Sequence, residues 1–591
     1  MVCSVVPINQ MGCFDILQSF YILAKIPTMR FLYVLLIICF KTFAQGTLSE
    51  NYFRLPLDIP MQLSGNFAEL RPNHFHAGFD FKTNQREGLP VYAAADGYVS
   101  RIKISNNGYG KAIYITHANG YTTVYGHLQK ATGVIEEKII DNQYAAKSYE
   151  IESFFKPDEL TVKKGDIIAI SGNTGGSEGP HLHFEIRDNK TEKTINPLLF
   201  GFELKDTKSP QISSVMVYPI DGEAVVNESK RPIALNLSLQ ADGTYLSDRV
   251  MASGNIGFGV ISSDFDDVSF NNNGIYKAAL ISNGYPIFGY QFDKLVFDEA
   301  RYVNAFIDFS RYKKTYQRVQ KLFMKNFFPW SNVTAAVNNG IIHVVPNFVQ
   351  LLQLYVADFN GNKVTVFIPV SYSNTPAIIV NDVKTTPYYI QAKNESIFEK
   401  ENWSVSFAAN TFYDDFYLQL SYQNAIFEVH NDLVPVHTNF TVAVADPVLD
   451  PKYKSKYFIA SINNGKLSYN YTFLQGTTLS CKTKNLGEFT LAKDTIAPKI
   501  SMLKSIQNKD ISNQKQLKLT VSDELSGIKT INGYLNDNWI LLEYESKLKR
   551  LTYEFKEQHI FNGNNNLKVI VTDNVGNSAT FETQSIKNQL K

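Results

Sequence analysis

Histidine is concentrated in one part of the chain, and this concentration is the first indication of chemistry. Six of the ten histidines lie between positions 74 and 183 of the 591 residues. Imidazole titrates near neutral pH and is the commonest side-chain ligand for metals. The cluster therefore indicates a metal site or an acid–base site. Its members are His74, His76, His117, His127, His181 and His183.

Two pairs in this region have spacings that suit metal binding. In a strand, residues i and i+2 project from the same face, so His181 and His183 can reach one centre. His76 and Asp80 lie four residues apart around a glycine and can converge on one ion. Two imidazoles and a carboxylate are a usual ligand set for catalytic zinc, which keeps a fourth position for water. We predict such a site from the His76–Asp80 pair and one of the other two histidines; the spacing leaves that choice open.

A zinc hydrolase needs further groups beside the metal. Zinc lowers the pKa of a bound water towards about 7. Another side chain must carry the water proton to the leaving amine, and another must stabilise the oxyanion. His127 and the second member of the 181/183 pair suit these roles, because imidazole titrates near working pH. His74 is expected at the surface, with a place in the groove as the alternative, and His117 is expected to be structural.

The elements that position these residues are predicted to be strands. Between residues 60 and 200, short apolar runs alternate with Gly, Asn and Asp. Residues 112–117 and 121–128 form two predicted strands, joined by a hairpin turn at Ala118-Asn119-Gly120. Residues 167–171 and 181–186 are predicted to be two more. The region therefore reads as a mainly antiparallel β-domain with few helices.

Several ordered motifs surround these residues. They are His76-x-Gly-x-Asp80; Gly88-Leu-Pro-Val-Tyr-Ala93 with Asp96-Gly97; Gly108-Tyr109-Gly110 with His117; Tyr125-Gly-His127-Leu128; Lys164-Gly165-Asp166; and Gly172-Asn-Thr-Gly175 followed by Gly179-Pro-His181-Leu-His183-Phe-Glu185. Through these motifs, residues 68–188 closely resemble the lysostaphin/LytM-type zinc metallopeptidases of peptidoglycan. A lone His-x-His is a weak signal, whereas six ordered motifs are specific.

The resemblance implies a role for each residue. His76, Asp80 and His183 correspond to the zinc ligands, and His127 and His181 correspond to the catalytic histidines. It implies a Zn²⁺-dependent endopeptidase that hydrolyses peptide bonds in bacterial peptidoglycan. The alternative is a non-catalytic regulator that activates a cell-wall amidase, as do some relatives that have lost ligands; here every ligand is present. The chain departs from many relatives at 129–160, a polar segment predicted to be a long loop that acts as a lid, a groove wall or a disordered flap.

Past residue 205 no helical periodicity persists, and strand-like runs continue to the end. We predict β-sandwich (Ig-like) modules at 206–371 and 495–591, and a β-rich module at 372–494, after a peptidase domain at 45–205. A weak repeat supports the first two. Lys208-Ser-Pro-Gln-Ile212 resembles Ile496-Ala-Pro-Lys-Ile500, and Asp358-Phe-Asn-Gly-Asn362 resembles Asp573-Asn-Val-Gly-Asn577. Each Asp-x-x-Gly-Asn segment offers one carboxylate and an amide, whereas Ca²⁺ takes six to eight oxygens, so the sequence favours plain turns.

Composition limits the partners and the compartment. The net charge of +1 predicts no nucleic-acid or anionic-membrane partner. Residues 1–44 are predicted to contain a signal peptide, with an apolar run at 31–40 that is too short to span a bilayer and a translation start that fits Met29. Export would place the chain in the periplasm, in the cell envelope or outside the cell, without a membrane span in the mature chain. The β-modules are predicted to bind glycan, protein or the peptidase domain itself, and the last contact would close its groove.

Overall fold

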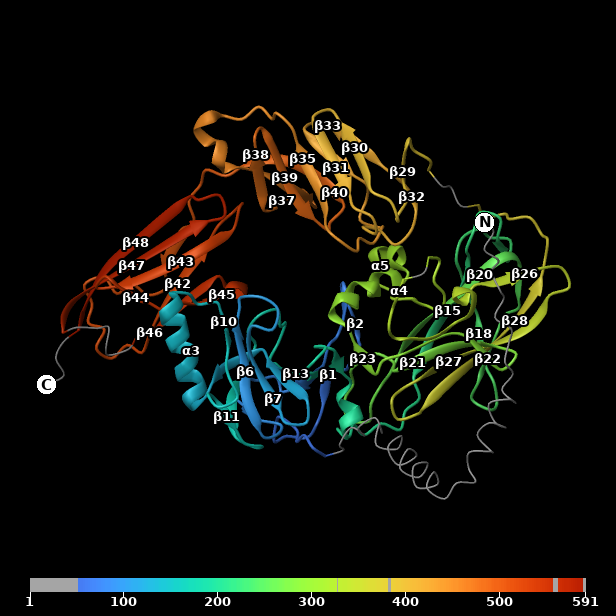
Figure 1. Ribbon diagram of the computed structural model, residues 1–591, viewed down its shortest axis with the longest axis horizontal. Coiled ribbons are helices and arrows are strands. Elements are labelled where there is room, and N and C mark those ends of the chain that lie inside the picture. The colour runs from blue at the N-terminus through green and yellow to red at the C-terminus, as the bar shows by residue number, and fades with distance from the viewer. Residues whose placement is uncertain (1–50, 327, 381–383, 556–561, 588–591) are drawn as a thin grey trace, which may run out of the picture. The chain divides into compact units, whose positions relative to one another are not determined.

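The computed structural model describes residues 51–326, 328–380, 384–555 and 562–587 (Figure 1). The predicted signal segment, 1–44, and the start at Met29 lie outside these residues. Within the described ranges, no helix is both long enough and apolar enough to cross a membrane. Strands dominate, as the sequence predicts, and they are arranged in several mainly antiparallel sheets.

The predicted zinc ligands and catalytic histidines lie in or beside a ten-stranded sheet, whose main path runs β1-β4-β13-β8-β7-β6-β10. All pairings along this path are antiparallel. On β13, Leu182 and Phe184 are fully buried, so the strand is held in place by packing of the residues that alternate with the histidines. The strands are β1 (Leu63–Gly65), β4 (Phe79–Lys82), β6 (Gly97–Ile104), β7 (Lys111–His117), β8 (Tyr121–Gly126), β10 (Ile151–Phe154), β11 (Thr161–Val162), β13 (His181–Asp188), β14 (Thr194–Ile195) and β23 (Lys294–Leu295).

A second, three-stranded sheet meets the first at His127. Its order is β5-β12-β9, with β5 (Pro90–Tyr92), β12 (Ile167–Ser171) and β9 (Leu128–Ala131). The predicted hairpin is confirmed as β7 and β8, but the second strand ends at Gly126 rather than at residue 128. His127 has a φ of 57°, and it is the one residue between β8 and β9. The chain therefore passes from one sheet to the other through a left-handed backbone conformation at this histidine. A smaller pair, β2 (Leu70–Arg71) and β3 (His74–Phe75), precedes β4.

The prediction of a long loop at 129–160 is wrong. This segment contains helix α3 (Gly133–Ala146) and strand β10, which pairs with β6 and extends the main sheet. Ile135, Ile139 and Gln143 are buried and are spaced four residues apart, so they form one face of the helix. The charged residues between them mask this short apolar pattern in the sequence. Lys147 ends the helix in the left-handed conformation, with a φ of 47°.

Apart from β23, which pairs with β14 of the first sheet, the strands of the next region, 206–371, are joined into one 13-stranded sheet. The long strand β20 holds it together, because it pairs antiparallel with β15 and parallel with β28. Two short helices, α4 (Val303–Phe306) and α5 (Phe309–Thr315), were not predicted, since neither is long enough to show a helical period. The strands are β15 (Gln211–Pro219), β16 (Val225–Val226), β17 (Ile233–Leu235), β18 (Leu237–Leu239), β19 (Tyr245–Ser247), β20 (Val250–Ser263), β21 (Lys277–Ser282), β22 (Tyr285–Gln291), β24 (Gln320–Lys321), β25 (Val333–Ala336), β26 (Ile342–Val344), β27 (Val349–Ala357) and β28 (Lys363–Tyr372).

The region 388–493 is a β-sandwich. Two five-stranded sheets share one core, in which Trp403 of the first sheet stacks on Phe427 of the second at 5.4 Å between ring centroids. Cys481 is buried in this core, as expected for a small apolar residue. The first sheet has β30 (Ser396–Lys400), β31 (Trp403–Phe407), β35 (Phe440–Val444), β38 (Thr472–Gln475) and β39 (Thr478–Thr483); the second has β33 (Leu420–Gln423), β34 (Ile426–Val429), β36 (Tyr457–Asn463), β37 (Lys466–Tyr469) and β40 (Gly487–Lys493). A separate pair is β29 (Tyr388–Ile390) with β32 (Phe416–Leu418).

The last region, 499–587, is a second β-sandwich, built from two four-stranded sheets around a core of its own. Leu519 and Leu551 come to this core from one sheet, and Leu535 and Val569 come from the other. The first sheet has β41 (Lys499–Met502), β42 (Gln516–Ser522), β45 (Glu543–Glu545) and β46 (Arg550–Glu554); the second has β43 (Ile528–Leu535), β44 (Asn538–Ile540), β47 (Gly563–Asp573) and β48 (Ser578–Lys587).

The burial of one face of α3 generates a stability prediction. Ile139→Ala removes apolar contact from a side chain that is 6% exposed, which typically costs about 2–5 kcal/mol. Amide hydrogens of residues 133–146 should then exchange at least about tenfold faster in hydrogen–deuterium exchange. Val134→Ala, on the exposed face of the same helix, is the matched control and should leave exchange unchanged. Equal exchange in the two variants would contradict the packing of this face.

Candidate metal centre and active site

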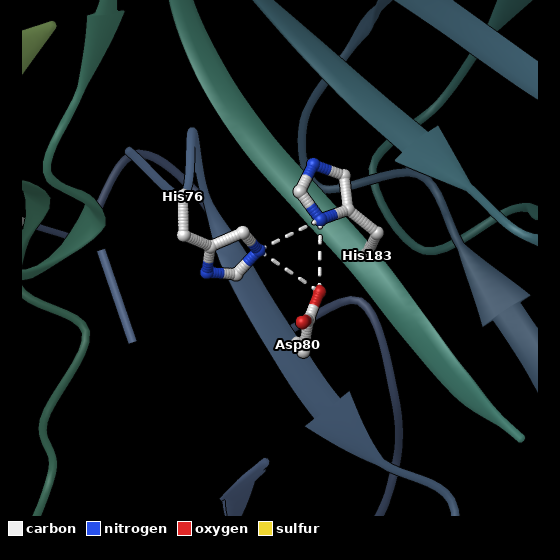
Figure 2. A group of neighbouring side chains, drawn as sticks. All are labelled: His76, Asp80 and His183. Carbon is white, nitrogen blue, oxygen red and sulfur yellow. Dashed lines mark hydrogen bonds and ion pairs between the residues drawn. The ribbon is translucent and has the colours of Figure 1, made fainter. Parts of the chain in front are cut away.

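Strand pairing brings the three predicted ligands together. In the β4–β13 ladder, Asp80 lies directly opposite His183, and His76 lies just before β4. Figure 2 shows the three side chains pointing toward one another. His183 Nδ1 lies 2.8 Å from Asp80 Oδ1, and His76 Nε2 lies 3.1 Å from each of these two atoms. Residues that are 107 positions apart in sequence therefore present three ligand atoms at one point.

The arrangement fits a zinc ion. Tetrahedral zinc with bonds of about 2.0–2.1 Å separates its ligand atoms by about 3.3 Å, close to the distances observed. His76 Nδ1 lies 2.7 Å from the carbonyl oxygen of Asn66, which can only accept, so that nitrogen carries the proton. His183 Nε2 lies 2.8 Å from a Glu185 carboxylate oxygen and donates in the same way. In the neutral form of each ring, the nitrogen that faces Asp80 is thus left with a lone pair.

The electrostatics of the site favour a cation at this point. Burial alone would lower the pKa of His183, but hydrogen bonds to Asp80 and Glu185 raise it to about 9. Burial alone would raise the pKa of Asp80, but His76 and the hydrogen bonds from the histidines hold it well below its usual range. Asp80 is therefore ionised at neutral pH, and its carboxylate stabilises positive charge between the two imidazoles.

A buried polar chain behind His183 was assigned no role by the sequence analysis. Glu185 is fully buried; its carboxylate accepts from His183, from the Tyr109 hydroxyl at 2.5 Å and from Arg187 Nε at 2.6 Å. Burial alone would raise the pKa of Glu185, but Arg187 and His183 lower it to about 2. Such a partner fixes the orientation and tautomer of a metal-binding imidazole. The strand period could have revealed this residue, because Glu185 follows His183 by two positions on β13.

Arg71 is a second residue that the sequence did not reveal. Its Nη2 lies 2.5 Å from Asp80 Oδ2, so one carboxylate oxygen contacts Arg71 and the other faces the two imidazoles. Gly65 leaves room for this contact, because a Cβ there would lie 2.3 Å from Arg71 Nη2 and 2.9 Å from Asp80 Oδ2. No spacing rule connects these three residues, which come from separate strands.

His127 and His181 lie beside the ligand group. Their ring centroids are 4.7 Å apart, and His181 Nε2 lies 3.4 Å from Asp80 Oδ1. Each donates from Nδ1 to a carbonyl oxygen at 2.8 Å, His127 to Thr174 and His181 to Gly179. In the neutral rings Nε2 is then free to accept a proton. Burial, followed by the charges of His183 and His181, lowers the pKa of His127 to about 3.

The other two clustered histidines lie outside this group. His74 is exposed, as expected, and its Nδ1 lies 2.9 Å from the carbonyl oxygen of Pro72. His117 is buried between the carbonyl oxygen of Asp96 and the hydroxyl of Thr123, both at 2.8 Å, which agrees with a structural role.

Comparison with known proteins identifies this part of the chain. Residues 74–149 and 139–197 match peptidase family M23, and residues 387–494 match the Zu5-like domain. Residues 74–197 form an M23 peptidase domain. The resemblance to the lysostaphin/LytM-type peptidases is thereby confirmed for this domain, and the two histidines and the aspartate with converging ligand atoms all lie within it.

Several bacterial proteins are similar to part of the chain, and three of them follow. A metalloprotease of Haemophilus influenzae described as uncharacterized is 35% identical over 161 residues, which is 26% of this chain and 28% of the relative. The DD-carboxypeptidase/endopeptidase Mpg of Neisseria meningitidis serogroup B is 37% identical over 123 residues, 21% of this chain and 22% of the relative. The peptidoglycan DD-endopeptidase ShyA of Vibrio cholerae is 31% identical over 147 residues, 24% of this chain and 28% of the relative. The matches thus span less than a third of each of these proteins.

The buried contact between Glu185 and His183 generates a prediction about metal affinity. Glu185→Gln keeps the size of the side chain but removes the charge that orients His183, so zinc affinity should fall about 10–100-fold. Competition with a chromogenic chelator measures this change. Glu192→Gln is the matched control, because exposed Glu192 also contacts Arg187, at 3.2 Å, but does not touch the histidine. Zinc affinity that is equal in the two variants would rule out the orienting role.

Proposed function

We propose that this protein is a zinc-dependent endopeptidase that hydrolyses peptide bonds in bacterial peptidoglycan, with His76, Asp80 and His183 as metal ligands and His127 and His181 as catalytic residues. The convergence of the three ligand atoms beside two further imidazoles carries this proposal. The M23 match and the names of the relatives, which include a peptidoglycan DD-endopeptidase, support the substrate class.

The catalytic residues can be given tasks from their hydrogen bonds. A zinc ion held by the three ligands supplies Lewis-acid chemistry. Because Nδ1 of His127 and of His181 donates to a backbone carbonyl, each ring presents Nε2 as the acceptor for a proton taken from the attacking water. The same nitrogen, once protonated, donates to the oxygen of the scissile carbonyl or to the leaving amine. The ring of Tyr109 stacks on His183 at 4.9 Å between centroids and limits rotation of that imidazole.

We further propose that the chain is exported, by a signal peptide within residues 1–44, to the periplasm, the cell envelope or the outside of the cell. Peptidoglycan lies outside the cytoplasm, so the proposed substrate requires this location. We also retain the proposed division into a peptidase domain at 45–205 and Ig-like or β-rich modules at 206–371, 372–494 and 495–591. The separate cores of the last two regions support their boundaries.

Substitution of the catalytic histidines tests the proposed function. His127→Asn and His181→Asn should each lower the release of peptides from purified sacculi by about 10²–10⁴-fold, because acid–base catalysis is lost. Zinc content should stay near that of the wild type, since neither residue is a proposed ligand. His74→Ala, an exposed residue two positions from His76, should keep full activity. Mass spectrometry of the released peptides and zinc analysis provide the measurements.

The same experiment separates the enzyme from a non-catalytic regulator. A wild-type protein that contains no zinc, cleaves no sacculi and stimulates a cell-wall amidase would contradict the proposed function. Wild-type turnover by His76→Ala or Asp80→Asn would contradict the assignment of the metal ligands instead.

We also propose that the 495–591 module contacts the groove of the peptidase domain. Lys547 Nζ donates to the carbonyl oxygens of Asn173 and Ser177, both at 2.6 Å. The same short segment supports the catalytic histidines, because Thr174 accepts from His127 and the Ser177 hydroxyl lies 3.2 Å from His181 Nδ1. These bonds support a contact that restricts access of a peptide to the two histidines.

Substitution of Lys547 tests this contact. Lys547→Ala removes an exposed cation, and contacts of that kind contribute about 0.2–1 kcal/mol. Because loss of the contact would open the groove to the peptide, activity on sacculi should rise about two- to fivefold. Lys518→Ala, which removes an exposed lysine from β42 of the same module, should leave activity unchanged. An unchanged or lower rate for Lys547→Ala would contradict a restrictive contact, whereas the zinc content of both variants should equal that of the wild type.

A further inference from the structure

Three carboxylates meet within the 206–371 module, outside the peptidase site. Asp206 precedes β15, Asp264 follows β20, and Asp358 follows β27. One carboxylate oxygen from each lies within 4.8 Å of the other two. Asp358 is the first residue of the Asp-x-x-Gly-Asn segment that the sequence suggested to be a plain turn. In the folded chain, two further carboxylates therefore join the single carboxylate of this segment.

A matching group lies where the 372–494 region joins the 495–591 module. Asp494 follows β40, Asp523 follows β42, and Asp573 ends β47; their ligand oxygens also lie within 4.8 Å of one another. The two groups therefore draw on corresponding places, namely the segment before the first strand of the module, the end of an internal strand and the Asp-x-x-Gly-Asn segment.

An asparagine organises each group in the same way. Asn362 donates from its backbone to Asp358 Oδ1 at 2.8 Å, and its side chain donates to Asp358 Oδ2 at 2.7 Å and to the Asp206 carbonyl at 3.2 Å. Asn577 makes the same bonds to Asp573, at 2.7 Å each, and to the Asp494 carbonyl at 3.1 Å. The same carboxylate constellation is thus built twice.

Buried oxygen atoms without partners point to a ligand. Asp264 is 6% exposed, and among the described residues its Oδ1 has no hydrogen-bond partner. In the second group, the backbone N–H of Ser526 donates to Asp494 Oδ2, whereas its buried hydroxyl oxygen contacts no partner in the described part of the chain. Burying an oxygen without a partner typically costs about 1–3 kcal/mol. A bound cation would satisfy Asp264 Oδ1 directly.

The charges in the first group support the same conclusion. Burial raises the pKa of Asp264 to about 7, and repulsion from Asp206 and Asp358 adds to the shift. The pKa of Asp206 is raised to about 6, first by burial and then by Asp358. All three aspartates line a cavity of about 40 Å³, which also contains Asn273 and has room for at least one water molecule.

We propose that each of these two groups binds one calcium ion. Each group offers three carboxylates, and Ca²⁺ takes six to eight oxygens, with water supplying those that the carboxylates lack. Zinc prefers nitrogen and sulfur ligands, and Mg²⁺ demands near-ideal octahedral geometry and is seldom held by an all-protein site. Each ion would link the segment that enters a module to the turn that follows β27 or β47, and it would neutralise the repulsion between the carboxylates.

Calcium binding to the full-length, zinc-loaded protein tests this proposal. The protein is dialysed into calcium-free buffer and titrated with CaCl₂ by calorimetry, and equilibrium dialysis gives the stoichiometry. We expect two equivalents of calcium to bind. The dissociation constant should be about 1 mM or lower, since extracellular calcium modules have values of about 10⁻⁴–10⁻³ M. Equal concentrations of MgCl₂ should not displace the bound calcium. Failure to bind calcium at about 10 mM would overturn the proposal.

Two substitutions assign the sites. Asp264→Asn and Asp523→Asn should each remove one equivalent of calcium, and the double variant should bind none. Asp242→Asn and Asp537→Asn, at exposed turns of the same two modules, should retain two equivalents. Two equivalents in the double variant would contradict the assignment. Zinc content and activity on sacculi are measured in parallel, so failure of the peptidase proposal would be seen separately.

Thermal unfolding provides a second, independent readout of calcium binding. Calcium at about 100 times its dissociation constant should raise the unfolding temperature of the wild type by about 5 °C or more. In calcium-free buffer, Asp264→Asn should unfold at or above the wild-type temperature, because it removes a repelling charge. A purely structural aspartate would instead lower it. An unfolding temperature of the wild type that does not respond to calcium would also contradict the proposal.

Discussion

The peptidase site depends on one pairing register, in which β4 and β13 place Asp80 opposite His183. Side chains alternate along a strand, so a slip of one residue would turn these ligands to the other face of the sheet. Burial of Leu182 and Phe184, which alternate with the histidines of β13, resists such a slip. Glu185 and Arg71 then hold the ligand side chains in place with charged hydrogen bonds. The proposed metal centre is therefore a consequence of how two strands pack.

The two histidines that we propose to be catalytic are positioned in a different way. His127 occupies a left-handed conformation where the chain leaves one sheet for another, a backbone state that costs a non-glycine residue roughly 1–2 kcal/mol. Its hydrogen bond to Thr174, and that of His181 to Gly179, assign the proton of each ring to Nδ1. Local strain of this kind persists where surrounding contacts determine the conformation, and it is common at functional sites. The segment 173–179 thus holds both rings in place.

The modules beyond residue 205 show the same principle on a smaller scale. In each carboxylate group, one aspartate comes from an Asp-x-x-Gly-Asn segment, and the other two come from positions that are distant in sequence. An Asp-x-x-Gly-Asn segment alone provides too few oxygens for calcium, so the sequence by itself favours a plain turn. Assembly of three strands around it changes the chemistry of the site. In both the peptidase domain and the modules, the proposed metal sites depend on contacts between strands.

The sequence by itself determined which residues could do chemistry. Clustered histidines, period-two spacing and ordered motifs indicated all five residues of the proposed site and an antiparallel fold, because these patterns are local. Tertiary structure alone decided which ring nitrogens face Asp80, that Arg71 contacts this aspartate, and that 129–160 contains a helix and a strand. It also decided that six aspartates form two groups. The reason is physical: each of these features depends on contacts between segments far apart in the chain, and local patterns of charge and hydrophobicity do not encode such contacts.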